Sequence, residues 1–537
     1  MSVLRGRTHI RRAAAAVVCL AIGIAVLPSH ARATAVTATP QAQCGPGARP
    51  ETDIQGRVPT ADYDSGRTKD GYQCNAEQVG HEGESGGFRV YRYVDAAGHE
   101  CAYYDTTLLV GTQVLLGPNA GVAVLDMSDP THPVRTATLT TPAMLSPHES
   151  VNLNQARGLL AAIDGSPATA PGVVDIYDVS GDCRTPVLKW SGPIGGAGHE
   201  ATFAPDGKTL YTTATALKYV TALDVTNPSV PVPVWVSTDF MFHGMNVSDD
   251  GNRLYAADLG FHGLTIVDVS QIQQRVSNPQ TPVVSRLTWS NVSIPQTALP
   301  ITIGGHPYLV EIDEYSRGTS TAPDAPVGAA RIIDIADDTA PVAISEMRLA
   351  VNDAENRAGP EKDDPGAADP TQGYAGHYCA VPQRADPGIV ACSFIVSGLR
   401  VFDIHDPYRP KEVAYFNPPS RDVATAAGKA SVASSLPSLS MCRLAVTATQ
   451  SSSSDSSPSP ADVFKSYPAA PFYGNTLTHW AMSAPTFVPS RNEVWYSDGM
   501  YGFYAVRLTN HVWSPDVAEP APASAVVVTG PGLPRTG

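Results

Sequence analysis

The chain has 537 residues, of which 43% are hydrophobic, enough to bury a large core. Its net charge is −15, and the first 33 residues contribute five arginines and no acidic residue, which leaves −15 − 5 = −20 for the remainder. This acidity excludes nucleic acid as an expected partner, because binding phosphates requires clustered Lys and Arg.

The first 33 residues have the pattern of a secretory signal peptide. Basic residues up to Arg12 precede an apolar run over residues 13–27, and Ala31-Arg32-Ala33 forms a small-residue cleavage site. We therefore expect a secreted, extracellular protein. Nothing after the leader is long and apolar enough to form a transmembrane helix, so we expect no membrane-spanning segment in the mature chain, and we expect a monomer.

Composition divides the remaining chain into four parts. Residues 34–85 are polar and rich in turn formers, which predicts an N-terminal extension with little core of its own. Residues 86–510 contain repeats, interrupted at 418–474 by an insert rich in Ala, Ser and Pro that cannot bury a core. Residues 511–537 form a Pro/Ala-rich tail. Its last five residues, LPRTG, resemble a sortase sorting signal without the apolar stretch that follows in that pattern, so cell-wall association and chance remain open alternatives.

One phrase recurs six times in the repeat region. Each copy is a short apolar, β-branched run that ends in Asp and is followed by a polar turn, which predicts a strand and then a turn. The Asp carboxylate can accept hydrogen bonds from turn amides two residues further on. The copies are GVAVLDMSDP at 121–130, VVDIYDVS at 173–180, YVTALDVTNP at 219–228, GLTIVDVS at 263–270, ARIIDIADD at 330–338 and GLRVFDIHDP at 398–407.

The spacing of strands around each copy predicts an all-β, seven-bladed β-propeller with four strands per blade. In the clearest blade, strands over 243–249 and 253–259 flank a hairpin turn, and strands over 263–269 and 282–289 follow. The seventh blade offers only three strands. We expect an N-terminal strand, Phe88 to Val94, to complete it as the outermost strand, which closes the ring without an open sheet edge.

This repeat phrase resembles the LVIVD repeat family, and hairpins such as HGMNVSDDGNRLYAAD resemble YVTN-type propeller repeats. The resemblance covers roughly residues 86–510. It implies a β-propeller of an exported bacterial protein, and it implies almost nothing about the reaction or ligand.

Seven cysteines follow the leader, and export permits disulfides. Cys379 and Cys392 lie in neighbouring apolar runs with the spacing of two paired strands, which predicts a disulfide between them. Cys44 with Cys74, and Cys101 with Cys183, are further expected pairs. Cys442 lies in the insert and is the residue expected to remain without a partner.

Five histidines stand at the expected start of a first strand, 25 to 30 residues before the Asp (or Arg507) that ends the third: His148, His199, His243, His377 and His479. His99 keeps a similar interval to Asp126. Because first strands line the channel of a propeller, these imidazoles would converge near its mouth and could bind a divalent transition metal such as Cu or Zn. The alternative is that the histidines are repeat residues that hydrogen-bond backbone groups between blades.

Two functions follow from these features. The first is an exported binding module that holds a protein or small-molecule ligand on its loop-rich face. The second is a metal-dependent enzyme, an oxidase or hydrolase, whose metal is held by the channel histidines. The sequence has no Ser-His-Asp order, P-loop or dinucleotide fingerprint that would name the reaction.

Overall fold

The computed structural model describes residues 38–106, 120–165, 171–215, 217–317, 324–357, 359–368, 373–420 and 479–515. These residues belong to one compact unit, residues 37–537. The predicted signal peptide, Cys442, most of the 418–474 insert and the LPRTG end lie outside them. In the described ranges no helix is long and apolar enough to cross a membrane.

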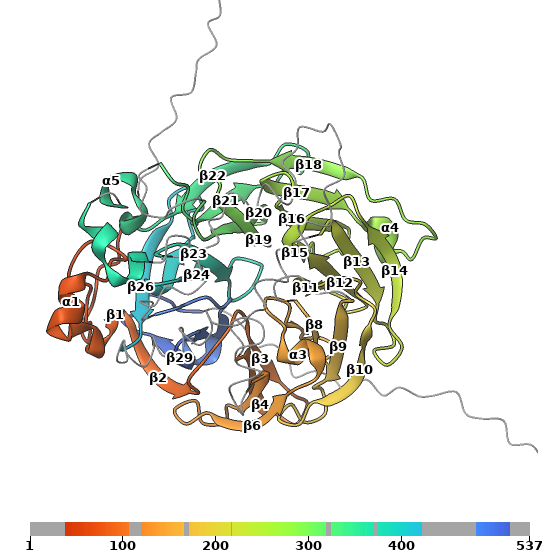
Figure 1. Cartoon of the computed structure of the whole chain (residues 1–537), viewed down its shortest axis with the longest axis horizontal. Coiled ribbons are helices and arrows are strands. Elements are labelled where there is room, and N and C mark those ends of the chain that lie inside the picture. The colour runs from red at the N-terminus through yellow and green to blue at the C-terminus, as the bar shows by residue number, and fades with distance from the viewer. Residues whose placement is uncertain are drawn as a thin grey trace, which may run out of the picture. The chain divides into compact units, whose positions relative to one another are not determined.

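Seven antiparallel sheets are arranged as blades around a central axis, which confirms the predicted seven-bladed β-propeller (Figure 1). From the inside outward, blade one contains β3 (Val90–Val94), β4 (Glu100–Asp105), β5 (Val122–Asp126) and β6 (Val134–Leu139). Blade two contains β7 (Asn152–Asn154), β8 (Leu159–Ile163), β9 (Val173–Asp178) and β10 (Val187–Pro193). Blade three contains β11 (Glu200–Phe203), β12 (Thr209–Ala214), β13 (Tyr219–Asp224) and β14 (Val232–Ser237).

The remaining four blades follow the same order. Blade four contains β15 (Phe242–Val247), β16 (Arg253–Asp258), β17 (Gly263–Asp268) and β18 (Val283–Leu287). Blade five contains β19 (Ile294–Ile303), β20 (His306–Glu314), β21 (Ala330–Asp334) and β22 (Val342–Met347). Blade six contains β23 (Gly376–Ala380), β24 (Ile389–Phe394), β25 (Gly398–Asp403), β26 (Lys411–Asn417) and, outermost, β1 (Tyr72–Cys74). Blade seven contains β27 (Thr486–Val488), β28 (Glu493–Asp498), β29 (Gly502–Leu508) and, outermost, β2 (Ala76–Glu82).

Helices are short and lie in the connections between strands. The α-helices are α1 (Thr60–Ser65), α3 (Pro142–Leu145), α4 (Ser270–Gln273) and α5 (Ala354–Arg357). The 3₁₀ helices are η1 (Arg67–Asp70), η2 (Ala350–Asn352), η3 (Pro360–Asp363), η4 (Pro365–Ala368) and η5 (Pro489–Arg491).

An N-terminal strand closes the last blade as predicted, but it is not the strand at 88–94. β2 pairs with β29, whereas β3 is the innermost strand of blade one and pairs with β4. The sequence prediction missed the hairpin between β3 and β4, where Asp95 accepts hydrogen bonds from the backbone N–H groups of Ala97 and His99. The second strand predicted for blade one, at 108–114, lies outside the described residues. Because β1 and β2 come from residues 72–82, the propeller begins within the segment predicted to be an extension.

The repeated Asp residues have the role predicted for them. In each of six blades the Asp that ends the third strand accepts a hydrogen bond of 2.8–2.9 Å from the backbone N–H two residues later. This bond fixes the turn that leads to the fourth strand. Blade seven has Arg507 at this position, and the Arg507 guanidinium forms an ion pair of 3.2 Å with Glu77 of the closing strand β2. Blade seven, which has Arg507 in place of the repeated Asp, is therefore also the blade that the N-terminal strand β2 closes.

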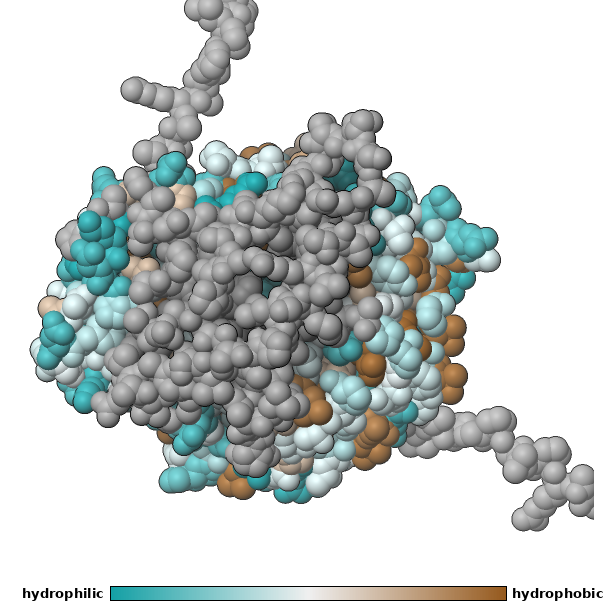
Figure 2. Space-filling model, viewed as in Figure 1, coloured by the Kyte–Doolittle hydropathy of each residue, from teal (hydrophilic) through white to brown (hydrophobic). Residues whose placement is uncertain are grey.

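Outer strands of blades one to five begin with a Pro-Val pair. Proline lacks the N–H group that an exposed strand edge would offer to another chain, and a bulge interrupts each of these strands. The valines themselves are exposed, by 55% at Val187 and 50% at Val232. Apolar side chains accordingly gather along the right-hand rim in Figure 2, where β10 and β14 lie in Figure 1.

Three disulfides confirm the expected pairs. Cys379–Cys392 joins two neighbouring strands of blade six, at directly opposed positions. Cys101–Cys183 joins blade one to the loop between β9 and β10 of blade two. Cys44–Cys74 attaches the N-terminal segment to β1. Together they link chain segments that lie 13 to 82 residues apart in the sequence.

The N-terminal segment is also held to blade six by a buried ion cluster. The Arg400 guanidinium of β25 contacts the carboxylates of Glu51 and Glu412, the latter at 3.0 Å, and stacks 4.6 Å from the Tyr415 ring. Gln55 donates a hydrogen bond of 2.9 Å to Glu412. All three ionic side chains are almost fully buried. Burial raises the pKa of Glu51, although Arg400 opposes the rise.

We expect Arg400→Met to lower the free energy of unfolding by about 3–5 kcal/mol, because it leaves two buried carboxylates without a cation. Guanidinium-induced unfolding of the disulfide-intact protein measures this change. Arg384→Met is the matched control, because Arg384 pairs with Asp249, whose side chain is 76% exposed, and such a pair contributes about 0–1 kcal/mol. Equal losses in the two variants would contradict the assigned role of Arg400.

Candidate metal centre

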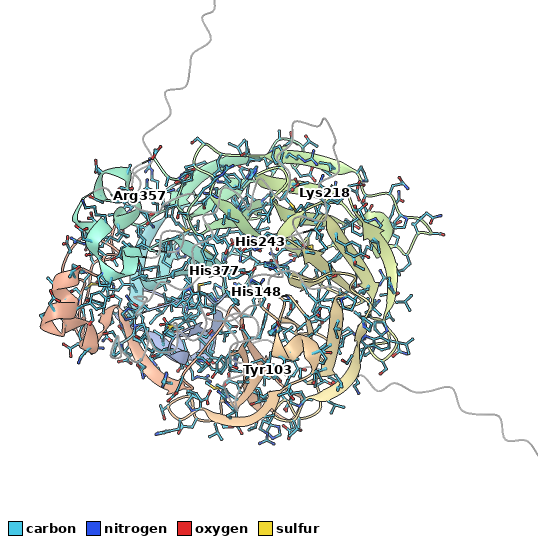
Figure 3. The ribbon with its side chains drawn as sticks, viewed as in Figure 1. Tyr103, His148, Lys218, His243, Arg357 and His377 are labelled. Carbon is cyan, nitrogen blue, oxygen red and sulfur yellow. A yellow bond between two sulfur atoms is a disulfide. The ribbon has the colours of Figure 1, made fainter. Side chains whose placement is uncertain are left out.

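Four of the five predicted histidines converge at the inner ends of four blades. His148 lies four residues before the first strand of blade two, and His199 directly precedes that of blade three. His243 and His377 lie within the first strands of blades four and six. Figure 3 shows the labelled His148, His243 and His377 near the middle of the ring. The rings of His148 and His199 are 4.6 Å apart, centroid to centroid, and those of His199 and His243 are 4.9 Å apart. All four side chains are at least nine-tenths buried.

The carboxylate of Glu149 lies among the four imidazoles. Its Oε2 atom is 3.0 Å from His199 Nε2 and 3.1 Å from His243 Nε2. Its Oε1 atom is 3.4 Å from His377 Nε2 and 3.8 Å from His148 Nε2. Each histidine therefore directs its Nε2 atom toward one buried carboxylate.

A second carboxylate, from Glu314 at the end of β20, completes the group. Glu314 Oε2 lies 2.9 Å from His377 Nε2, and Glu314 Oε1 lies 3.6 Å from His243 Nε2. The sets His148–Glu149–His199 and Glu149–His243–Glu314 each bring three ligand atoms within 4.8 Å of one another. We call these six residues, His148, Glu149, His199, His243, Glu314 and His377, the channel cluster.

Backbone carbonyls of the next blade orient two of the rings. His243 Nδ1 donates a hydrogen bond of 3.0 Å to the carbonyl of Pro295, and His377 Nδ1 donates one of 2.6 Å to that of Met482. These bonds connect blade four to blade five and blade six to blade seven. The alternative interpretation is that the histidines join neighbouring blades through backbone groups. It describes Nδ1 of these two rings, whereas Nε2 faces the carboxylates.

This orientation creates an electrostatic requirement. When Nδ1 carries the proton that bonds a carbonyl, a neutral imidazole presents its Nε2 lone pair to a carboxylate oxygen, and two acceptors repel at 3 Å. A positive charge must lie between them. It can be a second proton on the ring or a metal ion bound to Nε2.

The pKa values of the cluster reflect this requirement. Burial by itself lowers the pKa of His243 and His377, but Glu149 and Glu314 outweigh it and raise each to about 9. Burial would raise the pKa of Glu149, yet the surrounding histidines hold it well below its usual value. His148 differs, because burial holds its pKa well below the usual value and keeps the ring neutral.

A bend in the chain admits both His148 and Glu149 to the cluster. Consecutive residues of a regular strand point to opposite faces, so the sequence predicts that Glu149 points away from wherever His148 points unless the strand begins with a bend. His148 has φ +49°, a left-handed conformation that costs a non-glycine residue about 1 kcal/mol or more and that concentrates at functional sites. The bend turns Glu149 inward.

His479 does not join the cluster. Its Nε2 atom bonds the carbonyl of Pro418 at 2.8 Å and its ring packs against Tyr501. Met482 in blade seven corresponds to Pro295 in blade five, because each supplies the carbonyl that accepts from a histidine Nδ1 of the preceding blade. The position in blade seven that is equivalent to His243 is therefore near Ser483, four residues after His479. His99 also lies elsewhere, in the hairpin before β4, where Asp95 accepts from its Nδ1 at 2.8 Å.

Sequence reasoning missed Glu314 of the cluster and also Arg89, which lies beside the cluster together with Glu200 and Gln296. Arg89 precedes the first strand of blade one and bonds the Glu149 carbonyl at 2.8 Å, the Tyr378 hydroxyl at 3.1 Å and the Glu200 carboxylate. Burial raises the pKa of Glu200 to about 7, although Arg89 opposes the rise. Gln296 is the residue at which blade five lacks a histidine, and that gap was the available signal.

A second group of ligand types, Asp95, His99 and Asp182, lies at the hairpin of blade one. Its atoms already have partners. Asp95 Oδ2 accepts from the N–H of Cys183 at 3.0 Å as well as from His99, and Asp182 accepts from Arg184 at 2.8 Å. This group fixes the loop beside the Cys101–Cys183 disulfide.

Gly244→Ala should destabilise the protein by about 1–3 kcal/mol, because a methyl group there would overlap Glu200 Oε2 and the Gln296 carbonyl. Gly260→Ala in the same blade is the control, since its methyl group would meet Asp258 Oδ1 at 3.3 Å and nothing else closer than 3.7 Å. Thermal unfolding compares the two. Similar melting temperatures would show that Glu200 is not confined against Gly244.

His479 should make the protein sensitive to acid. Burial lowers its pKa from 6.5 to about 4. At pH values between these two, the imidazole is protonated in the unfolded chain and neutral in the folded chain. Stability is therefore lost as the pH falls through this range, by about 3 kcal/mol in total. Relative to His479→Gln, which keeps a donor but cannot titrate, the wild type should lose this amount of unfolding free energy between pH 7 and pH 4. Parallel stability curves would contradict the prediction.

Comparison with known proteins identifies the repeat. Residues 243–286, within blade four, match the LVIVD repeat, and no curated protein sequence matches the chain.

Solved structures similar to this one include a putative 6-phosphogluconolactonase from Bacteroides fragilis. It has 11% identity and a TM-score of 0.40, over 56% of this chain and 78% of that chain. The Cps50 (Swd1) β-propeller domain of Myceliophteria thermophila has 11% identity and a TM-score of 0.44 over 80% and 98%. Hydrazine synthase from Kuenenia stuttgartiensis has 11% identity and a TM-score of 0.39 over 60% and 78%. These similarities are too low to carry an argument, and the fold assignment rests on the seven sheets: the chain is a seven-bladed β-propeller whose fourth blade matches the LVIVD repeat.

Proposed function

We propose that this protein is an exported metal-binding propeller whose channel cluster holds one divalent transition metal ion, with copper and zinc as the foremost candidates. The observation that supports this most strongly is the convergence of four Nε2 atoms on Glu149. Imidazole nitrogens with one or two carboxylates are the usual ligands of such ions.

The distances fit a shared ion, as they also fit ion pairs of protonated rings. Two ligand atoms that each lie about 2.0–2.1 Å from one metal ion are separated by roughly 2.9–3.4 Å. The shortest approaches of His199, His243 and His377 to the carboxylates, 2.9–3.1 Å, lie in this range. Glu149 lies nearest the point to which the rings are directed, and it would shift to admit the ion.

His148 distinguishes the two interpretations further. A neutral ring 3.8 Å from Glu149 is too distant for a hydrogen bond and contributes nothing to an ion-pair network. Its strained backbone is costly without a ligand to hold. As a metal ligand, a neutral imidazole is the required form.

Charge balance also supports a divalent ion. The carboxylates of Glu149 and Glu314 carry two negative charges in an almost fully buried site, and a buried charge requires compensation. One divalent ion with neutral imidazoles supplies it. Such an ion, when bound, acts as a Lewis acid or a redox centre, which is the chemistry that an oxidase or hydrolase would use.

Export is part of the proposal. The signal-peptide pattern of residues 1–33 supports it, and the three disulfides fit an oxidising extracellular compartment. The other function predicted from the sequence, a binding module that uses its loop-rich face, stays a prediction.

Elemental analysis of the full chain, secreted and purified without chelators, should find about one metal ion per chain. The double variant His199→Ala/His243→Ala should lose it, because two of the four nitrogens are removed. His479→Ala is the matched control, a buried histidine of the same repeat position in the sequence that lies outside the cluster. Metal added to the metal-free wild type should also raise the melting temperature, since a ligand that binds only the folded state stabilises it.

Two results would reject the proposal. One is a wild type that neither contains nor takes up copper, zinc, iron, nickel or manganese. The other is a folded double variant that retains metal as well as His479→Ala does. Circular dichroism establishes that each variant is folded before its metal content is compared.

A further inference from the structure

We infer that the metal centre binds a small, uncharged, protic ligand, water or another hydroxyl compound, on its blade-five side, between Gln296 and Glu200. This inference rests on the metal proposed above and names what the ion would bind in addition to the protein.

The strand register places Gln296 at the position of the ligating histidines. In β23, Gly376 pairs with Phe394 and Tyr378 with Ser393, so His377 is the extra residue of a bulge. In β19, Pro295 pairs with Asp313 and Thr297 with Ile312, which makes Gln296 the extra residue there. Bulges of this kind re-aim a side chain.

Blade four confirms the correspondence. Its first strand has its irregularity between Phe242 and Met245, which includes His243. The carbonyl that accepts from His243 Nδ1 belongs to Pro295, the residue before Gln296. By this register the Gln296 side chain enters the channel beside the rings of His243 and His377.

Gln296 has unused hydrogen-bonding capacity. Its side chain is fully buried, and neither Nε2 nor Oε1 has a hydrogen-bond partner within the described residues. Leaving a buried amide unsatisfied costs about 1–3 kcal/mol per polar group, so such a group in a native protein indicates a missing partner. An amide binds copper and zinc more weakly than an imidazole does, so Gln296 is better suited to contact a ligand of the ion.

Glu200 provides a second acceptor on the same side. One of its oxygens is held by Arg89, while Oε2 is buried without a hydrogen-bond partner in the described structure. Both Glu200 Oε2 and the Gln296 backbone carbonyl lie against Gly244, the residue after His243. The absence of a side chain at Gly244 lets the Glu200 carboxylate approach blade five.

The charges favour an uncharged ligand. When Glu149, Glu200 and Glu314 are ionised, their three negative charges and the one positive charge of Arg89 leave −2, so a divalent ion brings the buried group to zero. An anion would add an uncompensated buried charge, which is costly. A hydroxyl compound can bind the ion through oxygen, donate a hydrogen bond to Glu200 Oε2 or Gln296 Oε1, and accept one from Gln296 Nε2.

Copper(II)-loaded full-length protein in D₂O tests this inference by pulsed electron paramagnetic resonance. The wild type should show strongly coupled exchangeable deuterons from a water bound to the ion. Gln296→His should remove them and add one coordinated nitrogen, because an imidazole then fills the position as in the other blades. Gln280→His is the matched control, since Gln280 is exposed on the connection before β18 and should leave the spectrum unchanged.

Titration with methanol and with azide measures the selection by charge. Methanol should bind Gln296→Leu about tenfold more weakly than the wild type, which corresponds to one lost hydrogen bond. Azide should bind the wild type poorly. Copper content should be equal in wild type, Gln296→Leu and Gln280→His, because Gln296 is not proposed to be a ligand.

The outcomes separate this inference from the metal centre itself. A copper-loaded wild type without coupled deuterons overturns only the exogenous site, as does a Gln296→His spectrum that retains them. Methanol affinity unchanged in Gln296→Leu, or azide bound more tightly than methanol, has the same effect. A wild type that binds no metal overturns both proposals.

Discussion

The pairing of β2 with β29 is the constraint on which the channel depends. Seven sheets converge on one axis only if the last blade is fixed beside the first, and this pairing connects the N-terminal segment to the C-terminal strands over six register positions. Blades one and seven then pack through a shared apolar core that includes Trp495 and Phe503. The Cys44–Cys74 disulfide and the buried Arg400 cluster hold the segment that precedes β2. Once the ring is closed, the first strands of the blades are fixed relative to one another. Their positions determine which side chains meet in the channel cluster.

Two of the channel histidines, His243 and His377, each make contacts through both ring nitrogens. Nδ1 of His243 and of His377 donates to a backbone carbonyl of the following blade, and Nε2 of the same rings faces Glu149 and Glu314. The bond at Nδ1 fixes the ring and leaves Nε2 in need of a cation or a proton. The structural role and the proposed metal-binding role of these histidines are therefore compatible, because the bond that joins the blades also directs Nε2 toward the carboxylates.

Departures from the repeat bring polar residues other than histidine to the channel. Blade one places Arg89 at the channel, blade five places Gln296 and Glu314 there, and blade seven has no histidine at the equivalent position. A symmetric ring of seven histidines would hold its nitrogens too far apart to share one ion. The irregular blades give the cluster the Glu314 carboxylate, a neighbouring cation and one side without a histidine, the side on which we propose that an exogenous molecule binds.

The sequence determined the fold class, because six copies of one strand-and-turn phrase with a terminal Asp leave few architectures other than a propeller. It also determined the disulfide of blade six and the histidine positions, since these follow from strand spacing. Only the tertiary structure decided that β2, not the strand at 88–94, closes the ring, because the Asp95 hairpin differs in sequence from the Asp-Gly hairpins of blades three and four. It likewise decided that Glu149 lies among the histidines and His479 does not. The position of Glu149 depends on the left-handed backbone of His148. The exclusion of His479 depends on its place in the sequence, four residues before the blade-seven position equivalent to His243. Neither feature is encoded in a local sequence pattern.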